Sequence, residues 1–477
     1  MELVETLHKS KIGPYQYAII AVCTFCAMLD GYDLFVVGLV LPHLPADFAT
    51  TAEKGYLISS GLVGMGVGAI FLAPIADRVG RKTVFIIGLA VNTTFLIVTA
   101  LAPNLQTMMV GRFFTGVGVG ALTVSIVVLV LEYSPTARRN LVIGIVGIGL
   151  PVGNTLAGLF GLTLMSWFGG AWQALFWFGV GLNTLGLILT LAFLPESLTF
   201  LAAKNNPDAR EKMARIGRRL RLTTEAVTTQ TDLTTQTDLA SPSRSDRTTG
   251  GSPAEDEGSL LGKKFYERTI LVCLGYAGVL AGYYLVSTWT PQLIASATGD
   301  TQKGAVTTTI LSVGTVAGSI LFGLVGLRVV SSRICWTALL ISVAGVIGFA
   351  VTMRGALLGL LFAGLVGIAV FMAVSSFSSM APTMYPPLLR AKGYGAMVGF
   401  GRAGAILSPV AAGYALNYLT PGQLYLVATV PLLIAAVAGF RLWIITRAQF
   451  TAELHVARRI VSPSGAPDKG DNIAVVD

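Results

Sequence analysis

Residues 73–82 read Ala-Pro-Ile-Ala-Asp-Arg-Val-Gly-Arg-Lys, a short charged stretch between two long apolar runs, 56–76 and 83–102. Each run can cross a bilayer, since a membrane-spanning helix needs about 20 apolar residues. Gly80 suits a tight turn, and the basic residues of the stretch hold it on the cytoplasmic side, where Lys and Arg collect. The stretch therefore predicts a short cytoplasmic connection between two membrane spans.

The pattern of apolar runs continues in both directions from this loop. Hydrophobic residues make up 53% of the 477 residues and charged residues only 12%, against about 25% in a soluble domain. Uncharged apolar runs fall near 15–42, 56–76, 83–102, 105–131, 141–165, 171–194, 269–297, 304–327, 334–353, 356–380, 393–419 and 422–446. Six runs, a polar linker and six more runs indicate two structural repeats, with another polytopic fold of the same count as the alternative. The sequence predicts an all-α membrane protein of twelve transmembrane helices in two six-helix halves.

The polar stretches divide the chain into five parts. We expect a cytoplasmic N-terminus at 1–14, an N-terminal half at 15–194, a cytoplasmic linker at 195–264, a C-terminal half at 265–446 and a cytoplasmic tail at 447–477.

The linker combines a basic segment with a polar, low-complexity one. Residues 207–222 are strongly basic with interleaved apolar residues, which fits either a helix lying on anionic lipid or a solvated loop. Residues 223–260 contain a tandem repeat at 228–239 and are poor in core-forming residues, so we expect disorder there and in the tail after Ile460.

Basic residues are distributed unevenly across the membrane. With both termini inside, all but five of the 33 Lys and Arg residues are cytoplasmic: Lys54, Lys303 and Arg354 lie outside, and Arg112 and Arg402 lie within spans. This bias is the positive-inside rule, so we expect a multi-pass protein of the cell membrane with both termini cytoplasmic. The net charge of +9 follows from that topology, and no basic domain supports a nucleic-acid partner.

Metal, redox and enzyme chemistry find little support in the sequence. All three histidines lie outside the spans, so a metal site lacks ligands. Cys23 and Cys26 form a C-x-x-C motif, but on an apolar helix without a nearby histidine their expected role is packing. No nucleophile constellation is present, so we expect no catalytic residue, metal or cofactor.

Ionisable residues at membrane depth are functional candidates, because burying them in lipid is costly. Asp30 and Asp33 lie near the middle of span 1, and their i, i+3 spacing puts both carboxylates on one helix face. Two acids so close on an apolar helix disfavour joint ionisation, so one is expected to hold a proton near neutral pH, as a proton carrier needs. The alternative is an acid that caps or pins a neighbouring helix. Between Asp300 and Glu453 the sequence has no acidic residue, so the second half offers no carboxylate for this task.

Two arginines also lie within the predicted spans. Arg112 is about eight residues into span 4 and Asp33 about nine from the same face, so at 1.5 Å per residue their depths match and an ion pair is plausible. Arg402 is about ten residues into span 11, and its half offers no acidic partner. A midplane arginine can receive a carboxylate through two parallel hydrogen bonds; alternatively it bonds backbone carbonyls or reaches an acid across the repeat interface. Glu132, at the inner end of span 4, is expected at the mouth or at an interface.

The 73–82 loop resembles the loop signature of the major facilitator superfamily, G-x-x-x-D-R-x-G-R-K, with Ala73 in place of the first glycine. In that family the aspartate clasps neighbouring helix ends and helps gate the outward-facing state. The gating residues that the resemblance implies are Asp77, Arg78, Gly80 and Arg81. The corresponding loop after span 8 has Leu327 in place of the aspartate and Val330 in place of the glycine, so the resemblance does not extend to a second clasp of the same kind.

Further motifs resemble the aromatic acid:proton symporter branch of that superfamily, over both halves without the linker. They are Asp30-Gly-Tyr-Asp33, Trp289-Thr-Pro291, Tyr385-Pro386 with Arg390 and Gly393, and Gly401-Arg402-Ala-Gly404 with Pro409. Members of that branch import benzoate-like, hydroxybenzoate-like or gentisate-like carboxylates with protons. The resemblance implies that the paired aspartates of span 1 and the arginine of span 4 take part in uptake.

Spans 7 and 10, which line the cavity in this fold, offer side chains suited to an aromatic guest. Aromatic rings can stack on such a substrate, and serines can bond a ring hydroxyl, although packing or interface roles are the alternative for each. The predicted substrate-binding residues are Arg112, Arg402, Tyr283, Tyr284, Trp289, Phe371 and Ser375, beside the proton-coupling Asp30 and Asp33. The expected partners are a small aromatic carboxylate, protons and the lipid bilayer, and the chain is expected to act as a monomer.

Together these features predict proton-coupled uptake of an aromatic carboxylate by alternating access. In this hypothesis a proton neutralises Asp30 or Asp33 and frees Arg112, while the substrate carboxylate engages Arg402. The alternatives are a transporter of another organic anion, a drug:proton antiporter and a transporter-like sensor. Residues 147–154 partly match the antiporter glycine–proline motif but carry leucine before the proline, and the linker offers a sensor no effector domain.

Overall fold

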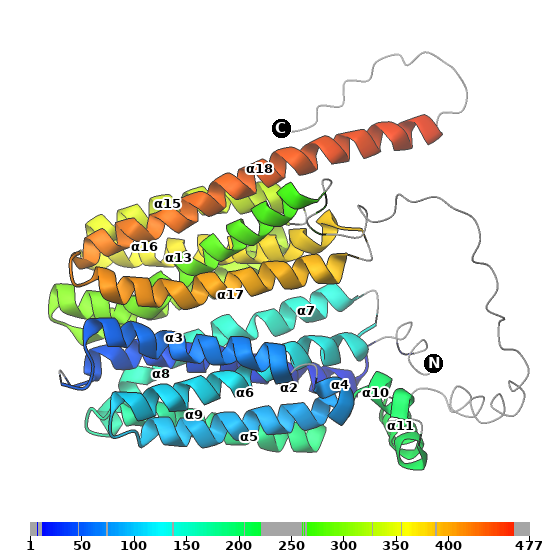
Figure 1. Cartoon of the computed structure of the whole chain (residues 1–477), viewed down its shortest axis with the longest axis horizontal. Helices are drawn as coiled ribbons and strands as arrows, with labels where there is room; N and C mark the ends of the chain where they lie inside the picture. Colours follow the sequence, from blue (N-terminus) through cyan, green and yellow to red (C-terminus); the bar gives the residue numbers. More distant parts are fainter. Residues whose placement is uncertain are drawn as a thin grey trace, which may run out of the picture.

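The computed structural model describes residues 7, 12–45, 47–72, 75–135, 138–204, 206–220, 260, 262, 265–326, 328–353, 355–386 and 389–461. Over these residues the chain forms helices and no strand. Figure 1 shows the long helices running side by side, with the short α4, α10 and α11 at one end of the bundle. We call that end the linker end, and the opposite end, where α2 finishes, the far end.

The N-terminal half and the linker contain α2 (Pro14–Val40), η1 (Leu41–His43), α3 (Thr51–Val67), the π-helix η2 (Gly68–Leu72), α4 (Ala76–Val79), α5 (Arg81–Ala100), α6 (Leu105–Glu132), α7 (Arg139–Gly147), α8 (Gly149–Trp167), α9 (Gln173–Phe193), α10 (Leu198–Lys204) and α11 (Pro207–Arg219). The C-terminal half contains α13 (Tyr266–Thr298), α14 (Thr301–Val325), α15 (Ser331–Thr352), α16 (Ala356–Met380), η5 (Ala381–Met384), α17 (Arg390–Ala415) and α18 (Pro421–Val461). Twelve spans of this described part are long and apolar enough to cross a membrane, and each overlaps one predicted run. The chain is therefore a multi-pass membrane protein, as predicted.

Several helix starts follow from local sequence. The hydroxyl of Thr50 accepts from the amide of Glu53, and the carboxylate of Glu53 accepts from the amide of Thr50, which caps α3. Asn104 and Asp300 accept from the first free amides of α6 and α14. These caps satisfy amides that have no partner inside the helix.

Glycines allow α3 and α6 to pack backbone against backbone. A Cβ on Gly64 would collide with the carbonyl oxygen of Phe113, and one on Gly116 with the carbonyl oxygen of Gly61. Close approach of this kind replaces the hydrophobic effect as the source of helix association in lipid. Because α6 carries Arg112, this contact fixes the depth of one predicted functional residue.

The fifth span differs from the single run predicted at 141–165. It is divided into α7 and α8, with the break at Ile148. Pro151 explains the break, since proline has no amide hydrogen to donate to the carbonyl four residues earlier and its ring crowds that carbonyl. The division places the first turn of α8 in the middle of the bundle.

The two halves are joined at the far end. The hydroxyl of Ser59 donates to the carbonyl oxygen of Ile406 at 2.7 Å, and the hydroxyls of Tyr56 and Tyr414 lie 2.6 Å apart. A Cβ on Gly38 would lie 2.6 Å from the carbonyl oxygen of Thr288, so the backbones of α2 and α13 touch there. These contacts link α2 and α3 of the N-terminal half to α13 and α17 of the C-terminal half, and we call them the far-end seam.

The linker end is packed more loosely. A Cβ added to Gly144 or Gly147 of α7, or to Gly395 or Gly399 of α17, would meet nothing within 4 Å. Helix α7 packs against α2 and α6, which belong to its own half. The structure therefore has a tight far end and a looser linker end.

The linker helix α11 packs on the N-terminal half. Its Ala209 and Ile216 are buried in a cluster that also contains Ile19 and Tyr133, and the guanidinium of Arg219 lies 5.5 Å from the ring of Tyr15. The apolar face of α11 is therefore occupied by protein and is not free to enter lipid. The low-complexity segment at 223–259 and the tail after 461 lie outside the described residues.

Candidate functional site

An ion pair between α2 and α6 lies inside the N-terminal half. Arg112 Nη1 donates to Asp33 Oδ1 at 2.6 Å, and Nη2 donates to Asp33 Oδ2 at 3.1 Å and to the backbone oxygen of Asp33 at 3.0 Å. The side chains of Arg112 and Asp33 are only 2% and 5% exposed. The pair predicted from matched depths is thus present, and its parallel hydrogen bonds are the geometry in which a buried pair best offsets desolvation.

Asp30 lies one turn before Asp33 and is less well satisfied. Its Oδ2 accepts from the hydroxyl of Thr123 at 3.2 Å, while Oδ1 is buried and has no hydrogen-bond partner among the described residues. Asp33 and Arg402 both lie within electrostatic range of this carboxylate. A buried carboxyl oxygen without a donor is costly while it carries negative charge, so Asp30 is the acid of the pair better suited to accept a proton.

Arg402 extends from the middle of α17 toward the N-terminal half. Within the described part of the chain its hydrogen bond is a weak one, from Nη1 to the sulfur of Met65 at 3.6 Å. It lies within electrostatic range of Asp30 across the interface, and of Tyr284. The sequence offered backbone carbonyls or an acid across the repeat interface as partners of Arg402. The structure has such an acid, Asp30, at longer range, and the guanidinium retains most of its N–H donors for another partner.

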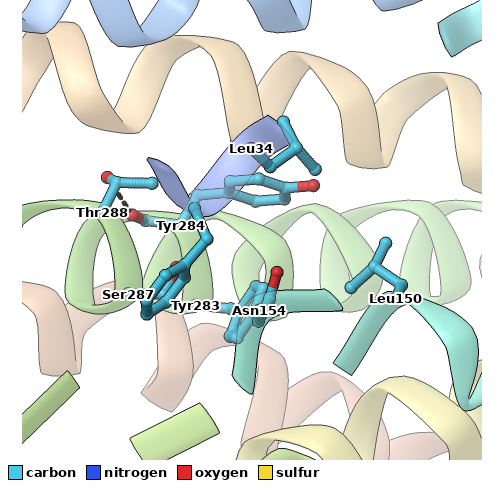
Figure 2. Close-up of a pocket in the computed structure, with 8 residues that line it drawn as sticks. Leu34, Leu150, Asn154, Tyr283, Tyr284, Ser287 and Thr288 are labelled. Carbon is cyan, nitrogen blue, oxygen red and sulfur yellow. Dashed lines mark hydrogen bonds between the residues drawn. The ribbon is translucent and has the colours of Figure 1, made fainter. Parts of the chain in front are cut away.

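A small cavity lies between the two halves. Leu34 and Phe35 of α2, Leu150 and Asn154 of α8, and Tyr283, Tyr284, Ser287 and Thr288 of α13 line it. Figure 2 shows these side chains gathered from helices of both halves.

Tyr283 and Tyr284 line this cavity, as predicted for span 7. Asn154 also lines it, and sequence reasoning missed its importance: Nδ2 of Asn154 donates to the hydroxyl of Tyr283 at 2.9 Å, across the interface between the halves. The signal available in the sequence was an amide three residues after Pro151 in an otherwise apolar span.

The other predicted substrate-binding residues are placed differently. The ring of Phe371 on α16 meets the ring of Tyr283 with centroids 5.8 Å apart, and Ser375 lies one turn further along α16. Trp289 is fully buried in α13 and is not among the side chains lining the cavity. The structure thus brings Phe371 to the edge of the site and leaves Trp289 in the packing behind it.

The predicted gating loop is tied to the start of the linker. Glu196 Oε1 accepts from the amides of Lys82 and Ser197 at 3.0 and 2.9 Å, and Arg81 Nε lies 3.4 Å from Glu132 Oε1. The hydroxyls of Ser197 and Thr199 also donate to Glu132, which therefore lies at a helix interface. Arg78 is exposed on α4, whereas the side chain of Asp77 and the whole of Leu327 lie outside the described residues, so the clasp implied for Asp77 stays a prediction.

Gly80 occupies a backbone conformation that other residues avoid, with φ at 100°, and a Cβ there would collide with the carboxylate of Glu196. We expect Gly80→Ala to destabilise the protein by about 1–3 kcal/mol through backbone strain alone. Thermal unfolding in detergent measures this. Gly66→Ala is the matched control, because a Cβ at Gly66 meets nothing within 4 Å. Equal unfolding temperatures for the two variants would contradict the prediction.

Comparisons with known proteins bear on the family and the fold. A sequence profile described as Major Facilitator Superfamily matches residues 23–293. The gallate transporter of Pseudomonas putida is 28% identical over 87% of this chain and 89% of its own, and the 4-hydroxybenzoate transporter PcaK of Acinetobacter baylyi is 28% identical over 84% and 85%. The xylose transporter XylE of E. coli, solved in a partially occluded inward open conformation, has a TM-score of 0.67 at 15% identity and covers 90% of this chain and 99% of its own.

The profile covers more than half of the chain, and the solved structure has the same fold over most of it. The relatives are named as transporters, and the sequence offers no catalytic constellation. The chain therefore belongs to the Major Facilitator Superfamily and is a membrane transporter whose relatives include transporters named for aromatic acids.

Proposed function

We propose that this transporter takes up an aromatic carboxylate together with a proton. The observation that carries the proposal is Arg402, a guanidinium within the bundle that has a single weak hydrogen bond in the described structure. A carboxylate can accept two parallel hydrogen bonds from such a group, which a lipophilic cation cannot do. The site therefore favours an anionic substrate over the cations that a drug exporter would carry.

The walls of the cavity support an aromatic guest. Tyr283 and Tyr284 present rings with centroids 5.4 Å apart, and Phe371 meets Tyr283 from α16. Aromatic rings pack on one another in offset or edge-on arrangements that add to the gain from burial. The names of the relatives, which include gallate, 4-hydroxybenzoate, benzoate and gentisate transporters, point to the same class of substrate.

Proton coupling is assigned to the paired aspartates. Asp33 is fully engaged by Arg112, whereas one buried oxygen of Asp30 is unpaired within the described part of the chain. We assign the transported proton to Asp30, and to Asp33–Arg112 the role of a charge-compensated pair that holds α2 against α6. This assignment is narrower than the hypothesis drawn from the sequence, in which either aspartate carried the proton and Arg112 was released.

The distribution of basic residues supports a cytoplasmic location for the linker end. On that orientation the far-end seam closes the external side, and the looser linker end faces the cytoplasm. The cycle then consists of opening the seam, loading substrate at Arg402 and a proton at Asp30, closing the seam again, and releasing both inside. Rocking of the two halves about a central site is the general mode of such repeat-built carriers.

Uptake is expected to follow the pH gradient and to be nearly indifferent to voltage, because one proton and one monocarboxylate carry no net charge together. Proteoliposomes with labelled 4-hydroxybenzoate outside measure this, with the pH gradient and a potassium diffusion potential imposed separately. Asp30→Asn, which mimics a permanently protonated acid, should still exchange substrate but should not accumulate it. Accumulation driven by voltage alone would contradict the one-to-one stoichiometry.

A further inference from the structure

We propose that Asn154 selects substrates that carry a ring hydroxyl. Asn154 is 3% exposed and lines the cavity between the halves. Its Nδ2 donates to the hydroxyl of Tyr283 at 2.9 Å, while its Oδ1 is buried and has no hydrogen-bond partner among the described residues. The inference rests on the proposed function, since it names which aromatic carboxylates the same site takes.

A buried amide that is only half paired is costly, because it gave up water and gained no partner. A hydroxyl group on the substrate can pair with it. A phenolic hydroxyl both donates and accepts, so it satisfies the free end of the amide whether that end is the oxygen or the nitrogen. An unsubstituted ring leaves the amide unpaired, and binding of such a ring therefore lacks this contribution.

The position of Asn154 suits the end of the substrate remote from its carboxylate. Tyr284 lies within electrostatic range of Arg402, whereas the neighbouring Tyr283 is bonded to Asn154. The two tyrosine rings meet edge to face, with centroids 5.4 Å apart. A substrate whose carboxylate is bound by Arg402 then lies along this aromatic wall with its far substituent near Asn154.

Two other buried asparagines show that an amide with an unpaired atom is alone no sign of a site. Asn183 on α9 donates to the carbonyl oxygen of Gly179, and Asn92 on α5 is completely buried, and both have unpaired side-chain atoms within the described structure. Neither lines the cavity between the halves. Asn183 therefore provides a control with the same chemistry and burial as Asn154 at a different place.

The test is the ratio of KM for benzoate to KM for 4-hydroxybenzoate, measured in proteoliposomes under an inward proton gradient. The wild type should favour 4-hydroxybenzoate by about tenfold or more, the factor expected for one hydrogen bond to a buried group that is otherwise unpaired. Asn154→Leu, which preserves size but removes the amide, should bring the ratio close to one by weakening 4-hydroxybenzoate transport alone. Asn183→Leu should leave the ratio at its wild-type value.

Asn154→Ser serves as a second variant if the leucine variant does not fold, since serine is small and too short to reach the same hydroxyl. It should also lower the ratio. A wild type that prefers benzoate, or an Asn154 variant that changes both KM values equally, would overturn the assignment of Asn154 while leaving the transport of aromatic acids intact. Failure of the wild type to transport either acid would overturn the proposed function, and the role of Asn154 with it.

Discussion

Asp33→Asn is expected to abolish accumulation of substrate and to lower the stability of the protein by about 3–5 kcal/mol, the cost of removing one partner from a buried ion pair. Arg112 is 2% exposed, and its guanidinium makes three hydrogen bonds to Asp33. Asparagine retains one acceptor but no charge, so the arginine would remain buried in the membrane without compensation. Thermal unfolding in detergent and uptake into proteoliposomes measure the two effects.

The double variant Asp33→Asn with Arg112→Gln separates stability from transport. Removing both charges should recover most of the lost stability, because no uncompensated charge remains. Transport should stay low, because the charged hydrogen bonds that hold α2 against α6 are missing in this variant. Glu267→Gln is the control, since Glu267 and Arg441 form an exposed ion pair whose side chains are 46% and 57% exposed. A double variant that transports like the wild type would show that transport does not need the pair.

Arg402→Gln is expected to raise the KM for an aromatic carboxylate by about 30-fold to 1,000-fold, because losing one side of a desolvated, hydrogen-bonded charge pair costs about 2–4 kcal/mol. The variant loses a weak hydrogen bond to Met65 and a longer-range attraction to Asp30, so its loss of stability should be smaller than that of Asp33→Asn. Arg402→Lys should recover part of the affinity, because lysine keeps the charge but loses the parallel pair of donors.

Direct binding of labelled substrate to purified protein checks this result without any contribution from the transport cycle. Arg441→Gln removes an exposed guanidinium from the neighbouring α18 and should leave the affinity unchanged. A substrate affinity of Arg402→Gln equal to that of the wild type would show that the carboxylate binds elsewhere, and Arg112 would then be the next residue to test.

Much of the fold was accessible from the sequence, because the bilayer imposes a length and a polarity on every span. The Asp33–Arg112 pair was accessible for the same reason. A helix rises by a fixed amount per residue, so two charges counted from the same face of the membrane can be matched in depth by counting residues alone. Depth is therefore the coordinate that a membrane sequence reveals most directly.

The face of each helix that points toward the cavity is harder to predict from the sequence than the depth of a residue. Trp289 and Tyr283 lie in the same span, yet the tyrosine faces the cavity and the tryptophan packs behind it. The helices are apolar on nearly all sides, so no polar stripe marks the face that points inward. Asn154 was missed for that reason, and also because the break at Ile148 interrupts the fifth span just before it.

The proximity of Asp30 to Arg402 across the two halves affects how easily the proton or the substrate could cross the membrane alone. In the proposed cycle, the carboxylate and the guanidinium balance each other in the empty carrier, and a proton and a substrate anion neutralise them separately in the fully loaded one. A carrier holding only the proton, or only the substrate, moves one uncompensated charge through the membrane, at a cost of about 2.5–3.5 kcal/mol or more. Slippage of either species alone is then disfavoured by roughly a hundredfold, without any part of the chain being dedicated to preventing it.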